Sequence, residues 1–411
     1  MPIQEETAST LFRARIATSA LFAANALTLS AWLPRLAEVQ QDLALSDVQI
    51  GAALSAGAVG GLLAGVWAGP LMNRSSSRAV AVVCLVGLIP VLPLLGFADQ
   101  FALIAIALFF IGALDAVMDA AMNAHSIRIQ HLSKRSILNG FHGFWSLGTV
   151  LGGIVGVASA AVGLSLGWTL TLVAILVALI GLAPSRWLLR GPDPHSYVDD
   201  ESIDERDIDG LGNADPSSLS MASTTTRVVL RPIIWALGAF IILAVMIEDI
   251  PARWGSIYLT DIGTPAAMAG WGFVAFTTAM TIGRFTGDRI IDALGERRWV
   301  QLSMATTAVV LGAGLLISTA WAFIIASAVT GFGVATLFPA AIRAAGHLPG
   351  VRPAVGISMV SWLSRAGFVV APLAVGAIAE GFGAAWGIGI TVIAAAILVP
   401  LSTVLRSEKS R

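Results

Sequence analysis

The sequence is divided into long, almost uncharged apolar stretches, and this division constrains the fold more than any other feature. Each stretch has roughly 20 residues, the length that an α-helix needs to cross about 30 Å of hydrocarbon. Charged residues make up only 12% of the chain and hydrophobic residues 56%, whereas a soluble domain has roughly 25% charged residues. A soluble fold would expose much of this apolar surface to water, so we expect a polytopic membrane protein.

The apolar stretches form two groups of six, separated by one long polar interval. The first group lies near residues 15–34, 48–70, 79–97, 101–124, 138–162 and 167–187. The second group lies near residues 231–255, 265–287, 299–319, 322–342, 354–378 and 385–405. The first stretch runs into Pro34 and Arg35 without a small-residue cleavage site, so we interpret it as a helix and not as a signal peptide. The sequence therefore predicts an all-α membrane protein of twelve transmembrane helices, with six-helix halves at 1–187 and 231–411.

The positions of the basic residues predict how the chain is oriented. If both termini are cytoplasmic, all of the 24 Lys and Arg residues except Arg35, Arg253, Arg284 and Arg365 fall in the termini and inner loops. Basic loops are retained on the cytoplasmic side when a membrane protein inserts. We therefore expect a multi-pass protein of the cell inner (plasma) membrane with both termini in the cytoplasm.

The polar interval at residues 188–230 has the composition of a linker between the two halves. Its acidic residues are Asp193, Asp199, Asp200, Glu201, Asp204, Glu205, Asp207, Asp209 and Asp215. Such a segment contains too few apolar residues to build a core of its own. We predict an acidic, flexible cytoplasmic tether, with a regulatory or partner-binding role as the alternative.

Other functional classes find little support in the sequence. Cys84 is the single cysteine, so neither a disulfide nor a cysteine-based zinc site is expected. No HExxH motif, P-loop in a soluble segment or pair of histidines is present, so we predict no metal, no cofactor and no enzymatic activity. The net charge of −1 gives no reason to expect a nucleic acid as a partner. We expect a monomer whose partners are a small-molecule solute, protons and the lipid bilayer.

Four segments carry a resemblance to a known family. They are GALDAVMDAAMNAH at 112–125, GFHGFWSLGTVLGG at 140–153, GRFTGDR at 283–289 and GFGVATLFP at 331–339. Together with Glu248 and Trp254, they resemble the fucose-permease-like branch of the major facilitator superfamily over nearly the whole chain, except residues 188–230. The resemblance implies the major facilitator fold and secondary transport by alternating access, with a solute site between the two halves.

The resemblance leaves the solute and the direction of transport open. We expect a small organic solute, either sugar-like or an organic anion, moved together with protons. A proton-driven exporter of drugs or metabolites is the alternative, and a solute sensor that does not transport is an alternative of another class. Solute-driven flux would separate a transporter from a sensor.

Carboxylates within the apolar stretches are candidates for proton coupling. Asp115, Asp119 and Asn123 are spaced four residues apart, which places them on one helix face. A charged, unpaired carboxylate costs several kcal/mol at this depth, so it must be protonated or meet a cation. We predict that Asp119, Asp115 and Glu248 couple transport to protons. The alternative for Asp119 is a structural bond to the backbone or to His142.

The candidate solute-binding residues combine this resemblance with polar or aromatic character inside the spans. They are Asn25, Asn123, Phe141, His142, Trp145, Glu248, Trp254, Phe338 and Arg365. Asn25 lies in the first helix, where the fucose-type permeases carry an acid. Pro251 and the charges around it predict a broken helix, in which Asp249 and Arg253 are spaced to pair.

Arg365 is the most unusual of these residues, because its guanidinium keeps its charge near the midplane of the membrane. It must therefore face a partner or a substrate. An ion pair with Asp115 and a bound anionic solute are the two alternatives.

Two inner loops resemble the gating loops of the superfamily. GPLMNRSSSR at 69–78 is similar to its GxxxDRxGRR loop and supplies Arg74 and Arg78, but Asn73 replaces the acid, so we expect a weakened clamp. The counterpart in the second half supplies Asp288, Arg289 and Arg297. We predict a gating role for these five residues, with an ordinary stop-transfer cluster as the alternative for the second set.

Overall fold

The computed structural model describes residues 8–133, 137–191, 193, 232–348 and 353–405. Within these residues, twelve helical segments are long and apolar enough to cross a membrane. The predicted all-α fold with twelve spans is therefore confirmed. No strand is present in the described residues.

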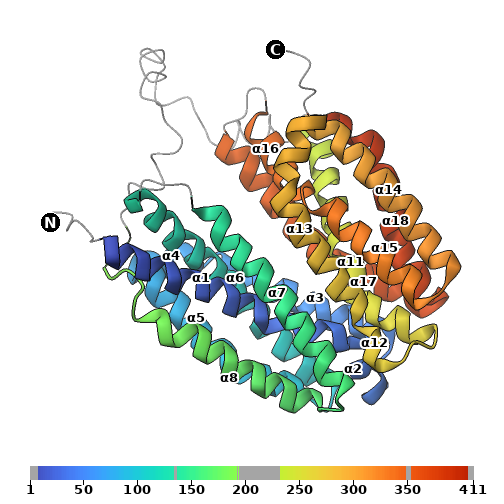
Figure 1. Ribbon diagram of the computed structural model, residues 1–411, viewed down its shortest axis with the longest axis horizontal. Coiled ribbons are helices and arrows are strands. Elements are labelled where there is room, and N and C mark those ends of the chain that lie inside the picture. The colour runs from blue at the N-terminus through green and yellow to red at the C-terminus, as the bar shows by residue number, and fades with distance from the viewer. Residues whose placement is uncertain (1–7, 134–136, 192, 194–231, 349–352, 406–411) are drawn as a thin grey trace, which may run out of the picture.

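The first half contains six long helices in the predicted order (Figure 1). They are α1 (Ala8–Ser30), α3 (Asp47–Gly65), α5 (Ser77–Gly96), α6 (Phe101–Ser133), α7 (Leu138–Ala161) and α8 (Leu166–Ser185). The short elements η1 (Leu33–Arg35) and α2 (Leu36–Asp42) follow α1, and α4 (Ala68–Arg74) follows α3.

The second half repeats this arrangement with six further long helices. They are α11 (Pro232–Asp261), α13 (Trp271–Leu294), α14 (Glu296–Ile317), α15 (Ala320–Val334), α17 (Pro353–Phe382) and α18 (Ala384–Leu401). The short elements are α12 (Ala266–Ala269), α16 (Leu337–Gly346) and η3 (Ser402–Val404).

The structure differs from the sequence prediction at two helices. The expected break at Pro251 is wrong, because α11 continues through this proline. A proline removes one backbone donor, and neighbouring packing in a membrane helix can compensate for that loss. The tenth span, expected as one helix, is instead divided into α15 and α16 at Ala335 and Thr336.

Within the first half, α3 and α6 approach until their backbones touch. A Cβ added to Gly60 would overlap the carbonyl of Phe109, and a Cβ added to Gly112 would overlap the carbonyl of Gly57. Small residues allow this close packing of membrane helices, where van der Waals contact replaces the hydrophobic effect as the main attraction. These glycines therefore fix the wall of the bundle that carries Asp115.

The two halves meet through α3 with α17 and through α7 with α13. Ser55 Oγ donates to the carbonyl of Val369 over 2.8 Å, and a Cβ on Gly376 would lie 2.6 Å from the carbonyl oxygen of Asp47. In Figure 1 the halves converge at the end that carries α2 and α12, and their ribbons separate toward the opposite end. We refer to the convergent end as the closed end.

Arg35 stabilises the first half at the closed end. Its side chain is buried. Its Nε donates to Glu38 over 2.7 Å, and its Nη1 donates to Thr169 over 2.8 Å and to Ser159 over 3.2 Å. The guanidinium therefore ties η1 to α7 and α8.

The first residues of the polar interval are held against the opposite end of the bundle. Leu188 and Leu189 are buried. Asp193 Oδ1 accepts a hydrogen bond from Ser77 Oγ over 2.8 Å and lies 3.5 Å from Arg128 Nη1. The first residues of the predicted tether therefore contact the bundle, and residues 194–230 of it lie outside the described residues.

Buried His125 completes this network. Its Nε2 accepts from the backbone N–H of Leu189 over 3.3 Å, so the proton of the neutral ring is on Nδ1. Nδ1 lies 2.9 Å from Ser77 Oγ, so the ring donates to the hydroxyl, which in turn donates to Asp193. We call His125, Ser77, Asp193 and Arg128 the linker anchor.

Candidate functional site

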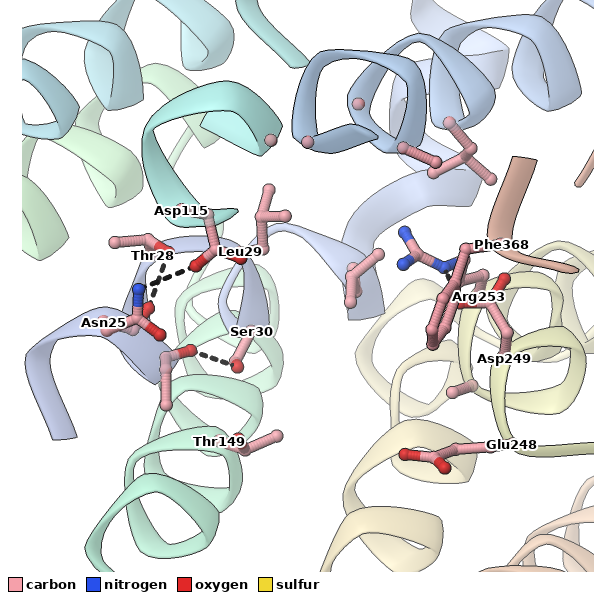
Figure 2. A pocket seen from close by; sticks show the side chains of 18 of the residues that line it. Asn25, Thr28, Leu29, Ser30, Asp115, Thr149, Glu248, Asp249, Arg253 and Phe368 are labelled. Carbon is pink, nitrogen blue, oxygen red and sulfur yellow. Dashed lines mark hydrogen bonds and ion pairs between the residues drawn. The ribbon is translucent and has the colours of Figure 1, made fainter. Parts of the chain in front are cut away.

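A cavity of about 450 Å³ lies between the two halves (Figure 2). Helices α1, α3, α6 and α7 of the first half supply one wall, and α11, α13 and α17 of the second half supply the other. Leucine, phenylalanine, alanine and glycine make up most of the lining, and a few polar side chains interrupt it. A concave, mostly apolar site with a few converging polar groups is typical of small-molecule recognition.

Asn25 and Asp115 meet on the wall formed by the first half. Asn25 Nδ2 donates to Asp115 Oδ1 over 2.7 Å, as Figure 2 shows, and Trp145 Nε1 donates to Asn25 Oδ1 over 3.1 Å. The amide therefore accepts from one neighbour and donates to the other. This chain of hydrogen bonds connects α1, α6 and α7.

Asp119 lines the same cavity one turn further along α6. Asn123 Nδ2 donates to its carboxylate over 3.1 Å and to its backbone carbonyl over 2.9 Å. His142 and Arg365 interact electrostatically with Asp119. Within the described part of the chain, neither Asp115 nor Asp119 has a basic nitrogen within 4 Å.

The hydroxyl groups of the cavity wall are already used as donors. Thr28 Oγ1 donates to the carbonyl of Asn25 over 2.7 Å, and Thr149 Oγ1 donates to that of Trp145 over 3.1 Å. Thr277 Oγ1 donates to the carbonyl of Phe273 over 2.9 Å. These hydroxyls therefore present only lone pairs to a molecule in the cavity.

Two carboxylates of α11 are paired with arginines. Arg253 forms an ion pair with Asp249, which confirms the pairing expected from their spacing. Glu248 points into the cavity in Figure 2, and its Oε1 lies 3.6 Å from Arg284 Nη2 of α13. Arg284 was not among the predicted site residues, although a single arginine inside an apolar span was the signal that could have revealed it.

Arg284 also links the two halves. Its Nη1 donates to Ser146 Oγ of α7 over 3.2 Å. Its Cζ lies 5.7 Å from the centre of the Trp145 ring, within the range of a cation–π contact. One guanidinium therefore contacts Glu248 in its own half and two residues of α7 in the other half.

Arg365 lines the cavity without an ion-pair partner among the described residues. The hypothesis of an ion pair with Asp115 is therefore wrong, since Asp115 bonds to neutral Asn25 instead. The guanidinium packs on Gly65 of α3, where an added Cβ would lie 2.5 Å from Nη1. The absence of a side chain on Gly65 creates the space that Arg365 occupies.

Only some of the predicted solute-binding residues line the cavity. Asn25, Trp145, Glu248 and Arg365 line it, whereas Asn123, Phe141, His142, Trp254 and Phe338 are not part of the lining. Phe141 is buried and stacks on Phe22 with ring centroids 5.8 Å apart, and His142 meets the same ring edge-on. Trp254 is fully buried in the core. Spacing places a residue on a helix, but packing against neighbouring helices decides which side chains reach the cavity.

The predicted gating residues lie at the ends of helices away from the closed end. Arg74 ends α4, Arg78 is near the start of α5, Asp288 and Arg289 are in the last turns of α13, and Arg297 is near the start of α14. None of the five takes part in an ion pair among the described residues.

One ion pair in this region joins Glu296, at the start of α14, to Arg343 of α16, where Arg343 Nε donates to Glu296 Oε1 over 2.9 Å. Among the described residues, no group of three or more His, Cys, Asp and Glu side chains is arranged to hold a metal ion.

Comparison with known proteins gives the family. The family model described as "Major Facilitator Superfamily" matches residues 16–251 and 249–411, which is nearly the whole chain. The chain belongs to the major facilitator superfamily. It is therefore a secondary transporter of that superfamily, which is a family of transporters and not of enzymes.

Curated relatives from the superfamily are similar over most of their length. An uncharacterized MFS-type transporter of Yersinia pestis is 28% identical over 89% of this chain and 89% of its own length. The membrane protein MosC of Rhizobium meliloti is 26% identical over 93% of this chain and 88% of its own length. Neither name gives a substrate.

Solved structures of transporters have the same fold. A mutant of the nucleoside transporter NupG matches with a TM-score of 0.75 and 13% identity, covering 95% of this chain and all of the other. A bacterial homolog of the human lysosomal transporter Spinster, in an inward-facing and unoccupied conformation, matches with a TM-score of 0.75 and 13% identity over 97% and 98% of the two chains. At this identity the likeness concerns the fold alone.

Proposed function

We propose that this chain is a proton-coupled transporter that moves a small organic solute, sugar-like or an organic anion, through the cavity between its halves. One observation carries the proposal: Asp115 and Asp119 line the cavity, and within the described residues neither carboxylate has a basic nitrogen within 4 Å. A carboxylate with no cation in direct contact can bind and release a proton during the cycle, because its charged form is expensive in a low-dielectric site.

Asp115 lines the cavity and is also connected, through neighbouring side chains, to the opposite half. Asp115 belongs to the hydrogen-bonded chain with Asn25 and Trp145, and the ring of Trp145 contacts Arg284 from the other half. A proton gained at Asp115 would weaken the hydrogen bond from Asn25, since a charged acceptor forms the stronger bond. The weaker hydrogen bond would alter how Asn25 holds Trp145, and thereby the contact between Trp145 and Arg284.

We propose that the structure represents the inward-facing state of the transporter. If the basic loops lie in the cytoplasm, the closed end faces outward, because α2 and α12 belong to outer loops on that topology. Contacts of α3 with α17, such as the Ser55 to Val369 hydrogen bond, support closure on the outer side. Alternating access then requires that these contacts break while the opposite ends of the halves come together.

Membership of the fucose-permease-like branch is part of the proposal. The segments at 112–125 and 140–153 that resemble this branch include Asp115, Asp119 and Trp145, three residues of the cavity. Asn25 takes the place of the helix-1 acid and bonds to Asp115 instead of adding a second charge beside it. We infer that the helix-4 carboxylates carry the coupling in this chain.

The test uses the purified protein in proteoliposomes under an imposed pH gradient. Uptake of labelled D-galactose, D-glucitol, D-gluconate and the cation ethidium would be compared with the gradient present and collapsed. Accumulation of one solute that requires the gradient supports the proposal, and the direction of movement separates import from export. Binding of a solute without any flux would identify a sensor and overturn the proposal.

A matched pair of variants controls this test. Asp119→Asn should lose gradient-driven accumulation, because the amide cannot exchange a proton. Asp99→Asn makes the same chemical change at an exposed residue between α5 and α6 and should behave as wild type. Equal accumulation by Asp119→Asn and wild type would contradict a coupling role for Asp119.

A further inference from the structure

The charges of the cavity do not balance locally, and the imbalance points to the chemistry of the solute. Asp249 is paired with Arg253, and Glu248 with Arg284. The three groups outside these pairs are Arg365 on the second half and Asp115 and Asp119 on the first. Arg365 and Asp119 interact electrostatically, but among the described residues none of the three groups has an oppositely charged atom within 4 Å. The cavity therefore has a cationic group on one wall and acceptors on the opposite wall.

Arg365 is equipped to bind an anion. Its guanidinium carries five N–H donors and keeps its charge at any physiological pH. In the described part of the chain it has no carboxylate within 4 Å, and its environment includes Gly65, whose missing side chain leaves the guanidinium room. A planar guanidinium in such a setting matches a carboxylate through two parallel hydrogen bonds.

The opposite wall is almost without free donors. The hydroxyls of Thr28 and Thr149 donate to the backbone, and the Asn25 amide donates to Asp115. Apart from the second N–H of the Asn25 amide, what remains for a bound molecule is a set of lone pairs on these hydroxyls and on the carboxylates of Asp115 and Asp119. This wall therefore favours a solute that brings its own O–H or N–H donors.

We propose that the solute is a small carboxylate whose anionic end binds Arg365 and whose other end carries hydroxyl or ammonium donors that bind the wall of Asp115 and Asp119. This inference rests on the proposed transport function and narrows its substrate class. A neutral sugar would leave the charge of Arg365 without a counter-charge, so it would bind less tightly than a carboxylate. Polyhydroxy acids and zwitterionic amino acids share the required chemistry.

The experiment compares ligands that differ only in the anionic group. Thermal unfolding and calorimetric binding of the full-length protein in detergent would be measured with D-gluconate and with D-glucitol, in which a hydroxymethyl group replaces the carboxylate. A ligand that binds only the folded state raises its thermal stability. We expect at least tenfold tighter binding of D-gluconate than of D-glucitol. The zwitterion 5-aminopentanoate forms the second arm, and tighter binding of it than of D-gluconate would identify ammonium as the donor group.

Variants test whether Arg365 is responsible. Arg365→Gln should weaken binding of the preferred carboxylate at least tenfold, Arg365→Lys should weaken it less, and Arg298→Gln, at an exposed arginine outside the cavity, should leave it unchanged. Gly65→Ala should also weaken binding by displacing the guanidinium, whereas Gly389→Ala, with nothing within 4 Å of the added Cβ, should not. A monodisperse elution profile of each variant would exclude misfolding as the cause.

Three outcomes would overturn the inference: equal binding of D-glucitol and D-gluconate, unchanged carboxylate binding in Arg365→Gln, or no stabilisation by either carboxylate. These failures differ from a failure of the proposed function. Gradient-driven uptake of D-galactose that survives Arg365→Gln would support transport and reject the anionic solute. Tight binding of D-gluconate that depends on Arg365, without flux of any solute, would support the ligand class and reject transport.

Discussion

Arg284 Nη2 of α13 lies 3.6 Å from Glu248 Oε1 of α11, and the same guanidinium reaches across to α7. Both side chains are about one-third exposed. The pair therefore connects Glu248, which lines the cavity, to the boundary between the halves. A movement of α7 against α13 must change the environment of Glu248.

The first prediction concerns this pair. Arg284→Gln should lower the stability of the protein, because it leaves Glu248 without its cation and Ser146 without its donor. Glu248→Gln should cost less, and the double variant should recover part of the loss. Unfolding by SDS titration of the four proteins would give the coupling energy, which we expect to be about 1 kcal/mol for a partly exposed pair.

A coupling energy of zero would show that the two residues act independently. Arg284→Lys serves as the control, since it keeps the charge and loses the planar geometry. It should retain more of the stability than Arg284→Gln.

The second prediction concerns the linker anchor. Ser77→Ala should destabilise the protein by about 1–3 kcal/mol, because buried His125 loses its hydrogen-bond acceptor and Asp193 loses a donor. Ser75→Ala is the matched control two residues away, where the exposed hydroxyl bonds only to the backbone of its own helix. Thermal unfolding in detergent would compare them, and equal stability of the two variants would contradict the assigned role of Ser77.

A third prediction follows from the same contacts. Asp193→Asn should speed tryptic cleavage after Arg190, whose carbonyl accepts from Arg128 Nη2 over 2.8 Å in the folded protein. Weakening the anchor exposes this peptide bond by local opening. Asp292→Asn, at an exposed residue of α13, is the control. An unchanged cleavage rate at Arg190 in Asp193→Asn would argue against the anchor.

The fourth prediction concerns closure at the closed end. A Cβ on Gly51 would overlap the carbonyl oxygen of Pro372 in the other half. Gly51→Ala should therefore push α3 and α17 apart and favour opening of this end. Spin labels on Gln41→Cys and Ala267→Cys, in a Cys84→Ser background, would report a longer distance component in Gly51→Ala. Gly389→Ala, with nothing within 4 Å of the added Cβ, should give the same distance distribution as its parent. No difference between the two glycine variants would refute the steric argument.

The sequence predicted the twelve spans well because hydrophobic length is set by the bilayer and needs no knowledge of neighbours. It was less successful at helix ends. Helix α6 continues to Ser133, beyond the apolar stretch that was expected to end at residue 124. The additional turns carry His125 and Arg128, which lower the hydropathy without interrupting the backbone hydrogen bonds. A hydropathy window reports the apolar part of a helix and not its full length.

The cavity was only partly predictable. Asp115 and Asp119 were expected to share one face, and both line the cavity. Phe141 was predicted to bind the solute, but its ring stacks on Phe22 inside the first half. The pairing of Glu248 with Arg284 joins two helices of the second half, and no spacing within either segment indicates it. Contacts between helices depend on rotation and tilt, which the sequence pattern does not specify.

The most direct test of proton coupling through this cavity compares wild type with Asp115→Asn in proteoliposomes that contain a pH-sensitive dye. D-gluconate, 5-aminopentanoate, D-glucitol and D-galactose would be added one at a time, while labelled solute exchange and internal pH are followed together. We predict that one solute acidifies the interior with wild type, and that Asp115→Asn still exchanges this solute without moving protons. Proton uptake by Asp115→Asn equal to that of wild type, or solute exchange by wild type without any proton movement, would contradict the account.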